Sequence, residues 1–280
     1  MKDELKFDEV GIWSEIKLEI IKKYAQAYSQ ILSKQPRLQH VYIDGFAGAG
    51  VVLSEKTGEF IPGSPLNALA VEPPFKHHYL VDLKGSRVAS LKARTAGRKD
   101  VDVFKGDATT VLVNEVIPKV QFKDYRRALC LLDPYGLHLN WEVFAACGNS
   151  RAIDLFLNFP IFDINRNALW RNPAAVAPVQ AKRLTAFWGD DSWKTAAYRD
   201  SPQASLFNAE PDQEKLDNDT VVRAFCERLR RVAGFAHVAK PLPMHIPSGP
   251  VVYYLLFASQ NANAVKIANN ILDKYRKRKR

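Results

Sequence analysis

The sequence predicts an α/β fold with a Rossmann-like, doubly wound and mostly parallel sheet, in a single domain spanning residues 1–280. First, apolar strand-like segments alternate with helical segments between residues 40 and 160, which is typical of parallel sheets. Second, these segments end in acidic or amide residues, at the edge where such sheets bind ligands. Third, two strand-like segments, 235–244 and 251–260, predict a β-hairpin near the end of the chain.

Composition excludes several classes of protein. Hydrophobic residues make up 47% and charged residues 25%, as in folded soluble proteins. The longest apolar run covers only residues 251–258, whereas a membrane helix needs about 20 residues. The charged N-terminus, MKDEL, predicts no signal peptide. The cysteines Cys130, Cys147 and Cys226 lie far apart, which argues against disulfides and against a metal site. We therefore expect buried cysteines in a cytoplasmic protein.

The net charge of +10 is concentrated at one end of the chain. Six basic residues occur in the last seven, KYRKRKR, at positions 274–280. Such a basic tail attracts nucleic acid or another polyanion. A solubilising, frayed helix end is the alternative interpretation.

An amphipathic helix is predicted over residues 11–33. Apolar residues recur there at three- and four-residue steps, and the sequence Gln35-Pro36 ends the pattern. The lysines Lys17, Lys22 and Lys23 are assigned to the solvent side. We expect a packing helix that precedes the first strand of the sheet.

The first predicted strand ends in a glycine turn, VYIDGFAGAG, at residues 41–50. Asp44 closes the strand, and Gly45, Gly48 and Gly50 let the backbone approach a ligand closely. The spacing G-x-x-G-x-G reverses that of dinucleotide-binding turns. An ordinary tight turn is the alternative. Residues 51–63 then predict a hairpin or flap, and a helix begins at Ser64-Pro65 with Ser64 as its N-cap.

The later strands also end in polar residues. Strands are predicted at 77–83, 101–108, 128–136 and 152–160, and their tips carry Asp82, Asp107, Asp133 and Asn158. Because the carboxyl ends of parallel strands share one edge of the sheet, we expect these side chains and Asp44 to lie near one another.

An inserted helical subdomain is predicted at residues 161–220. Aromatic and basic residues alternate in it, a pattern that can stack bases and pair phosphates, although a helical cover packed on the sheet would look similar. The residues concerned are Trp170, Phe187, Trp188, Trp193, Arg166, Arg171, Lys182 and Arg183. Residues 212–219 predict a linker, and residues 221–229 and 262–275 predict two amphipathic helices.

The whole pattern resembles class I S-adenosylmethionine-dependent methyltransferases, in which a parallel sheet ends in a β-hairpin. The resemblance implies that Asp44 and the turn Gly45-Phe46-Ala47-Gly48-Ala49-Gly50 hold the methionine end of the cofactor. It also implies that Asp82 binds the ribose hydroxyls and that Asp107 binds the adenine amino group.

The segment LLDPYG resembles the strand tip of methyltransferases that act on amino groups of adenine. Asp133 and the Pro134 carbonyl would accept the hydrogens of a planar amine, and Tyr135 would stack on a base swung out of its helix. Transfer then needs in-line positioning against the sulfonium methyl. The sequence has one proline followed by Tyr-Gly, so a structural turn is the alternative.

Across the chain, the resemblance is to the three-Cys-motif partner proteins. The matching segments are IWSEIKLEIIKKYAQAY, YIDGFAGAG, GSPLNAL, LLDPYG, DLFLNFP and VVYYLLFASQ. This resemblance implies a methyltransferase-like domain that works beside a protein with three cysteines.

The leading hypothesis is therefore an S-adenosylmethionine-dependent methyltransferase that acts on DNA or RNA at a base amino group. The basic tail and the Trp/Arg-rich insertion would contact the nucleic acid. A non-catalytic scaffold subunit of a two-protein system is the rival hypothesis. A nicotinamide-dependent oxidoreductase is disfavoured by the order of the glycines.

Overall fold

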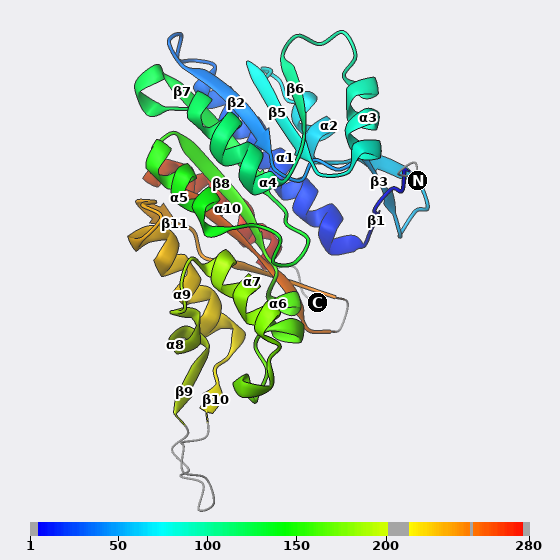
Figure 1. The fold of residues 1–280 in the computed structure, drawn as a ribbon. Coiled ribbons are helices and arrows are strands. Elements are labelled where there is room, and N and C mark those ends of the chain that lie inside the picture. The colour runs from blue at the N-terminus through cyan, green and yellow to red at the C-terminus, as the bar shows by residue number, and fades with distance from the viewer. Residues whose placement is uncertain (1–4, 201–212, 247–248, 277–280) are drawn as a thin grey trace, which may run out of the picture.

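The computed structural model describes residues 5–200, 213–246 and 249–276, and it confirms the predicted fold class. The main sheet has the strand order β11-β13-β8-β7-β2-β5-β6, and β12 also pairs with β13 (Figure 1). Five strands are parallel, and β13 runs antiparallel to its neighbours β8, β11 and β12. This is the Rossmann-like order of the class I methyltransferase type. The strands are β2 (Gln39–Asp44), β5 (His77–Asp82), β6 (Val101–Lys105), β7 (Arg126–Leu132), β8 (Ile153–Phe159), β11 (His237–Val238), β12 (Leu242–His245) and β13 (Val251–Ser259).

Helices cover both faces of this sheet because successive strand residues point to opposite sides. In β2, Tyr42 enters one core, whereas Val41 and Ile43 enter the other. The first core lies under α1 (Ile12–Leu32), α2 (Ser64–Leu69), α3 (Gly85–Arg94) and α10 (Ala262–Arg276). The second lies under α4 (Ala108–Val111), a π-helical turn (Leu112–Val116), α5 (Trp141–Ser150), α7 (Pro178–Trp188), α8 (Trp193–Ala197) and α9 (Asn218–Arg231). Short 3-10 turns follow at Ile117–Lys119 and Phe122–Asp124.

Helix α1 confirms the predicted packing helix, with one correction. Its Tyr24 ring lies 5.2 Å from Phe156 and 4.8 Å from Phe257, measured between ring centroids. A large aromatic side chain buried in this way contributes about 1.5–3 kcal/mol. Lys17 was assigned to the solvent side, which is wrong, because only 6% of its surface is exposed. Its ammonium group has a partner inside the protein, described below.

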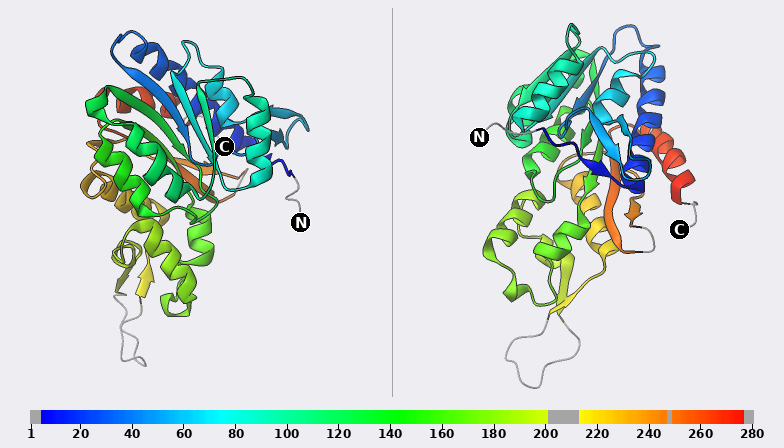
Figure 2. Two further views of the ribbon diagram at one scale, coloured as in Figure 1. Left: turned by 45° about the horizontal axis from the view of Figure 1, so that its top comes forward. Right: turned by 90° about the vertical axis from the view of Figure 1, so that its right-hand side faces the viewer.

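The predicted flap is confirmed as a hairpin of β3 (Val51–Ser54) and β4 (Phe60–Pro62). An N-terminal strand, β1 (Glu9–Val10), pairs in parallel with β3, so the first described residues lie beside the flap (Figure 2). The prediction that Ser64 caps α2 is wrong. Gly63 is the N-cap residue, and the Ser64 side chain instead hydrogen bonds to Asp44.

The inserted segment is largely helical, and it extends beyond the sheet (Figure 2). It contains α6 (Ile161–Asn167), a 3-10 turn (Pro173–Ala175), α7, α8, β9 (Tyr198–Asp200) and β10 (Gln213–Lys215); residues 201–212 lie outside the described part. The predicted linker at 212–219 instead contributes β10 and the start of α9.

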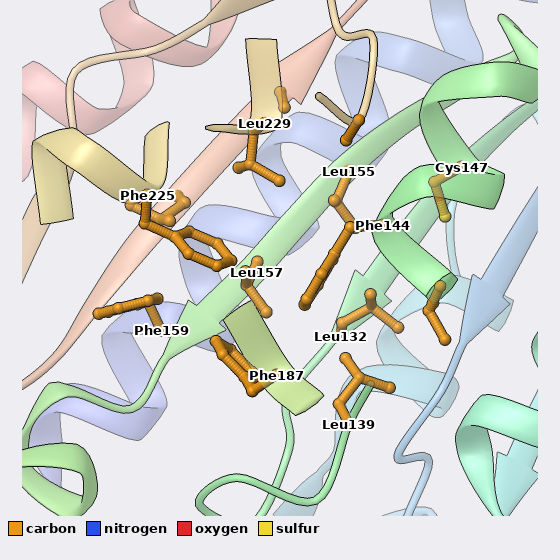
Figure 3. Close-up of a cluster of buried hydrophobic side chains, with 14 of the residues drawn as sticks. Leu132, Leu139, Phe144, Cys147, Leu155, Leu157, Phe159, Phe187, Phe225 and Leu229 are labelled. Carbon is orange, nitrogen blue, oxygen red and sulfur yellow. The ribbon is translucent and has the colours of Figure 1, made fainter. Parts of the chain in front are cut away.

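Most aromatic residues of the insertion belong to the hydrophobic core. Phe187, Trp188 and Trp193 are at most 4% exposed, and Figure 3 shows Phe187 beside Phe225 and Phe144. The prediction that these three stack nucleic-acid bases is therefore wrong, and the alternative of a helical cover is correct for them. Trp170 differs, since it is 41% exposed. The basic residues of the pattern, Arg166, Arg171, Lys182 and Arg183, are all exposed.

Three further predictions concern the whole chain. The cysteines Cys130, Cys147 and Cys226 are buried and free, as expected. No helix among the described residues is long and apolar enough to cross a membrane. The basic tail is described only as far as Arg276, where α10 ends, so residues 277–280 of that prediction lie outside the described residues.

Candidate active site

A cavity of about 430 Å³ lies at the carboxyl ends of β2, β7 and β8, and we call it the site cavity. Its volume falls in the range of small-molecule sites, about 300–1,000 Å³. Its position, where the strand order reverses between β2 and β7, is where doubly wound sheets bind ligands. Its lining includes the predicted residues Phe46, Ala47, Gly48, Gly50, Asp133, Pro134 and Tyr135, and also Ser14, Lys17, Ser64, Asn158 and Tyr253.

The glycine turn forms one wall of the site cavity in a fixed conformation. Gly48 and Gly50 have φ angles of +65° and +90°, which side chains rarely tolerate. The turn is held by backbone bonds, since Gly45 N–H donates to Leu131 and Ala47 N–H donates to Val81. Several of its N–H groups are therefore already paired within the protein. A ligand would meet the glycine surfaces of the turn rather than a row of free donors.

Asp44 lies directly beneath the turn and is completely buried. Burial raises the pKa of its carboxyl to about 6, against hydrogen bonds from the Ser64 side chain, the Phe46 N–H and the Tyr42 hydroxyl, which lower it. The Tyr42 hydroxyl lies 3.1 Å and the Phe46 nitrogen 3.2 Å from the carboxylate. Asp44 and Gly45 do not line the site cavity. A cationic group in the cavity would favour the ionised form of Asp44.

The two acids predicted to bind a nucleoside also lie outside the lining. Asp82 is 5% exposed, and its carboxylate accepts the N–H groups of Gly48 at 2.9 Å and Lys84 at 2.8 Å. It therefore ties the glycine turn to β5. Asp107 is exposed and caps α4 by accepting the Thr110 N–H at 3.0 Å. Asp82 therefore contacts the glycine turn, whereas Asp107 lies after β6, the next strand of the sheet.

A second network joins the N-terminal segment to the turn after β7. The Tyr135 hydroxyl accepts a hydrogen bond from Arg87 at 2.7 Å and donates one to Asp8 at 2.8 Å. Arg87 also pairs with Asp8, and one of its nitrogens lies 3.9 Å from Asp82. Burial and the carboxylate of Asp8 raise the pKa of Tyr135 above its usual range. Tyr135 is still 55% exposed, and the Arg87 guanidinium carbon lies 5.4 Å from the centre of its ring.

The polar centre of the site cavity is a triad that sequence reasoning missed in part. The Lys17 ammonium forms an ion pair with Asp133, and the Asn158 amide nitrogen donates to the other Asp133 oxygen at 2.6 Å. Burial opposes the charge on Lys17, but Asp133 outweighs it and raises the pKa of Lys17 above its usual range. The Lys17 nitrogen also lies 5.4 Å from the centre of the Tyr253 ring. Lys17 lies seven residues before the buried Tyr24, about two helical turns, so the two residues share one face of α1. This spacing is the signal in the sequence that could have placed Lys17 inside the protein.

Asn158 leaves one polar atom without a partner. Its side-chain oxygen is buried and accepts no hydrogen bond from any described residue. Such buried acceptors are rare because each costs about 1–3 kcal/mol when it is left unpaired. Asn158 lines the site cavity and is 8% exposed. The unpaired oxygen is itself buried, so a ligand with N–H donors would reach the Asp133 carboxylate rather than this atom.

Comparisons with known proteins support the fold at a coarse level. No family model matches the chain, and no curated protein matches it. Protein LPL1258 from Legionella pneumophila, of family DUF519, is similar in structure, with 13% sequence identity, 92% of each chain covered and a TM-score of 0.52. A S-adenosylmethionine-dependent methyltransferase from Clostridium acetobutylicum has 12% identity over 86% of this chain and 92% of its own, with a TM-score of 0.39.

Fibrillarin from Aeropyrum pernix, solved with natively bound S-adenosyl-L-methionine, has 10% identity, with 85% of this chain and 76% of its own covered, and a TM-score of 0.36. Of these three similarities, only that to the Legionella protein is strong enough to indicate a shared fold. The resemblance to three-Cys-motif partner proteins stays a prediction, because none of these proteins carries that description.

Proposed function

We propose that this protein is an S-adenosylmethionine-dependent methyltransferase that acts on an amino group of a nucleic-acid base. The observation that carries the proposal is the shared lining of the site cavity. It is formed by the glycine turn after β2 together with Asp133 and Asn158, at the tips of β7 and β8. The sheet order of the class I methyltransferase type supports the same assignment.

The residues present fit the methionine end of the cofactor. The glycine turn offers close backbone approach, and the buried acid Asp44 lies behind it to balance a positive charge. When bound, the cofactor supplies an electrophilic methyl group on a sulfonium centre. Asp82 would meet the ribose hydroxyls from the neighbouring strand tip, and Asp107 would meet the adenine amino group. These two roles require that a nucleoside extends past the lining of the cavity toward β5 and β6.

The acceptors of the cavity would orient the substrate. The carboxylate of Asp133, held by the Asn158 amide N–H, would accept one hydrogen of a planar amine, which brings the nitrogen lone pair forward. The Pro134 carbonyl is a further acceptor in the same turn. Lys17 holds the Asp133 side chain in place through their ion pair. The exposed Tyr135 would stack on the base. The site then has to align the amine nitrogen with the methyl group of the cofactor.

The partners are part of the proposal. Trp170 and the exposed basic residues of the insertion would contact DNA or RNA, together with the basic tail. By resemblance, a protein with three cysteines would work beside this chain. Titration calorimetry with S-adenosylmethionine tests the proposal. We expect the wild type to bind S-adenosylmethionine and Asp82→Ala to bind it more weakly. If the wild type shows no heat of binding at millimolar ligand, the proposal is refuted.

A scaffold subunit without catalysis is the second candidate, and one observation favours it. The Lys17 ammonium already occupies one oxygen of Asp133, which leaves fewer acceptor positions for an amine. In a scaffold this ion pair would be purely structural. Radiolabel transfer from S-adenosylmethionine to nucleic acid, lost in Asp133→Ala, would exclude the scaffold.

A further inference from the structure

A second cavity lies beside the first, and the proposed methyl transfer does not use it. It encloses about 420 Å³ between the start of α1, α9, β12 and α10, and we call it the Trp13 cavity. In the right-hand view of Figure 2, α10 (red) lies beside β12 and β13 (orange). The lining residues are Trp13, Asp219, Val222, Arg223, Lys240, Pro241, Leu242, Pro243, His245, Tyr254, Tyr275 and Arg276.

Aromatic rings form much of the wall of the Trp13 cavity. The rings of Trp13 and His245 lie 6.3 Å apart between centroids and are tilted by 57°. Tyr254 and Tyr275 are buried behind them, with exposed fractions of 4% and 3%. The Tyr254 hydroxyl donates to Asp219 at 2.5 Å. The half-buried indole of Trp13 is therefore a flat apolar surface at the wall of the cavity.

The rim of the Trp13 cavity is positively charged. Arg223 and Lys240 are exposed, and neither forms an ion pair with another described residue. Arg276 binds Asp273 and two backbone carbonyls, but its Nε is buried and has no hydrogen-bond partner among the described residues. Asp219 is the acid in the lining. Asp273 pairs with Arg276, and Asp217 lies within electrostatic range of Arg223. The exposed side chains of Arg223 and Lys240 are therefore the two lining cations that an anionic ligand would meet.

Neighbouring residues of α1 and of β13 line the two cavities. Ser14 lines the site cavity and Trp13 lines the other, and Tyr253 and Tyr254 are divided in the same way. Tyr253 and Tyr254 point to opposite faces of β13, since Tyr253 belongs to one core and Tyr254 to the other. The Tyr253 hydroxyl donates to the Trp13 carbonyl at 3.1 Å, so α1 and β13 are joined at this boundary. The two linings therefore touch at the contact between Tyr253 and Trp13, and neighbouring units of one chain molecule would lie on either side of it.

We propose that the Trp13 cavity binds a nucleotide that flanks the target base in single-stranded or locally opened nucleic acid. The base stacks on Trp13, and its phosphate lies at Arg223 and Lys240. An aromatic surface next to cations is the chemistry that holds single-stranded nucleic acid. Calling the neighbouring base a target rests on the proposed methyltransferase function, whereas binding of the flanking nucleotide does not need catalysis.

Fluorescence anisotropy with a labelled 12-nucleotide strand, as DNA and as RNA, tests this inference. Trp13→Ala should raise the dissociation constant by about 5- to 150-fold, the range known for loss of one stacked base. Trp13→Phe should restore most of the affinity. The double variant Arg223→Ala/Lys240→Ala should reduce the slope of log K against log salt by about 1.4, since each neutralised phosphate of a single strand contributes about 0.7.

The control is Lys92→Ala/Lys99→Ala, which removes the same charge from exposed lysines outside both cavities. A salt slope that falls equally in both double variants would overturn the inference. So would a wild-type protein that binds S-adenosylmethionine but no strand, a result that points to an acidic protein partner instead. Strand binding that depends on Trp13, without cofactor binding, would keep this inference and refute the proposed function.

Discussion

The ion pair between Lys17 and Asp133 is the most informative feature to perturb. Replacing Lys17 by Met removes the ammonium and keeps most of the apolar stem of the side chain. Among the described residues, the Asp133 carboxylate then has only Asn158 as a partner, and the Tyr253 ring loses the cation that lies 5.4 Å from its centre. If the ion pair with Lys17 holds Asp133 in a fixed position, the two residues must be strongly coupled energetically.

Removing Lys17 and removing Asp133 should lower the free energy of unfolding by different amounts. Asp133 keeps 30% of its side-chain surface exposed, so losing Lys17 should cost about 1–2 kcal/mol, less than the 3–5 kcal/mol of a fully buried pair. Lys17 keeps only 8%, so Asp133→Ala leaves a buried ammonium without a counter-ion. We expect that loss to be about 3 kcal/mol. The order of the two effects follows from burial alone.

Urea denaturation of both single variants and of the double variant measures the coupling directly. We expect the double variant to lose at least 1 kcal/mol less than the sum of the single losses, roughly twice what independent sites show. The exposed pair of Lys194 and Asp191, with nitrogen and oxygen 2.8 Å apart, is the control and should couple by less than about 0.5 kcal/mol. Additive losses at Lys17 and Asp133 would refute the argument that they act as a unit.

Two further predictions concern the glycine turn and its surroundings. The buried carboxyls of Asp44 and Asp154 both have a pKa of about 6, raised mainly by burial. Ionisation of each carboxyl should therefore lower the free energy of unfolding as the pH rises from about 4 to 6, by up to about 3 kcal/mol. Replacing either residue by Asn should remove that decrease, as measured by urea denaturation at each pH. Only Asp44→Asn should also abolish the weakening of S-adenosylmethionine binding below pH 6, and equal binding profiles for both variants would contradict the placement of the cofactor. Gly48→Ala and Gly58→Ala, at φ +65° and +69°, should each cost about 1–2 kcal/mol of stability. Only Gly48→Ala should weaken ligand binding in calorimetry, and equal affinities would count against a role for the turn.

The fold was predictable because its signals are local. Period-two and helical patterns, turn residues and polar strand tips lie within short windows of sequence. They predicted the sheet, the flap over 51–63 and the packing helix. The glycine turn and the turn at Asp133 were brought together as expected, because both follow neighbouring parallel strands, β2 and β7.

The rest depended on contacts between distant residues. The partner of Lys17 lies 116 positions away, and the Asp8 partner of Tyr135 lies 127 positions away. Contacts between residues so far apart in the chain produce no local sequence pattern. Trp188 and Trp193 were misjudged for the same reason, because the same aromatic and basic composition suits a packed helical cover and an exposed binding surface.

Transfer of a labelled methyl group from S-adenosylmethionine to nucleic acid tests the central claim most directly. Adenine-containing DNA and RNA would be incubated with wild type, Asp133→Ala and the control Gly58→Ala, in the flap but outside the cavity lining, and the digested nucleosides would be analysed by mass spectrometry. The account predicts label on a base amino group with wild type and Gly58→Ala, and a loss of at least about 100-fold with Asp133→Ala, since alignment supplies most of the rate. A wild-type protein that binds the cofactor but leaves every base unmodified would contradict it.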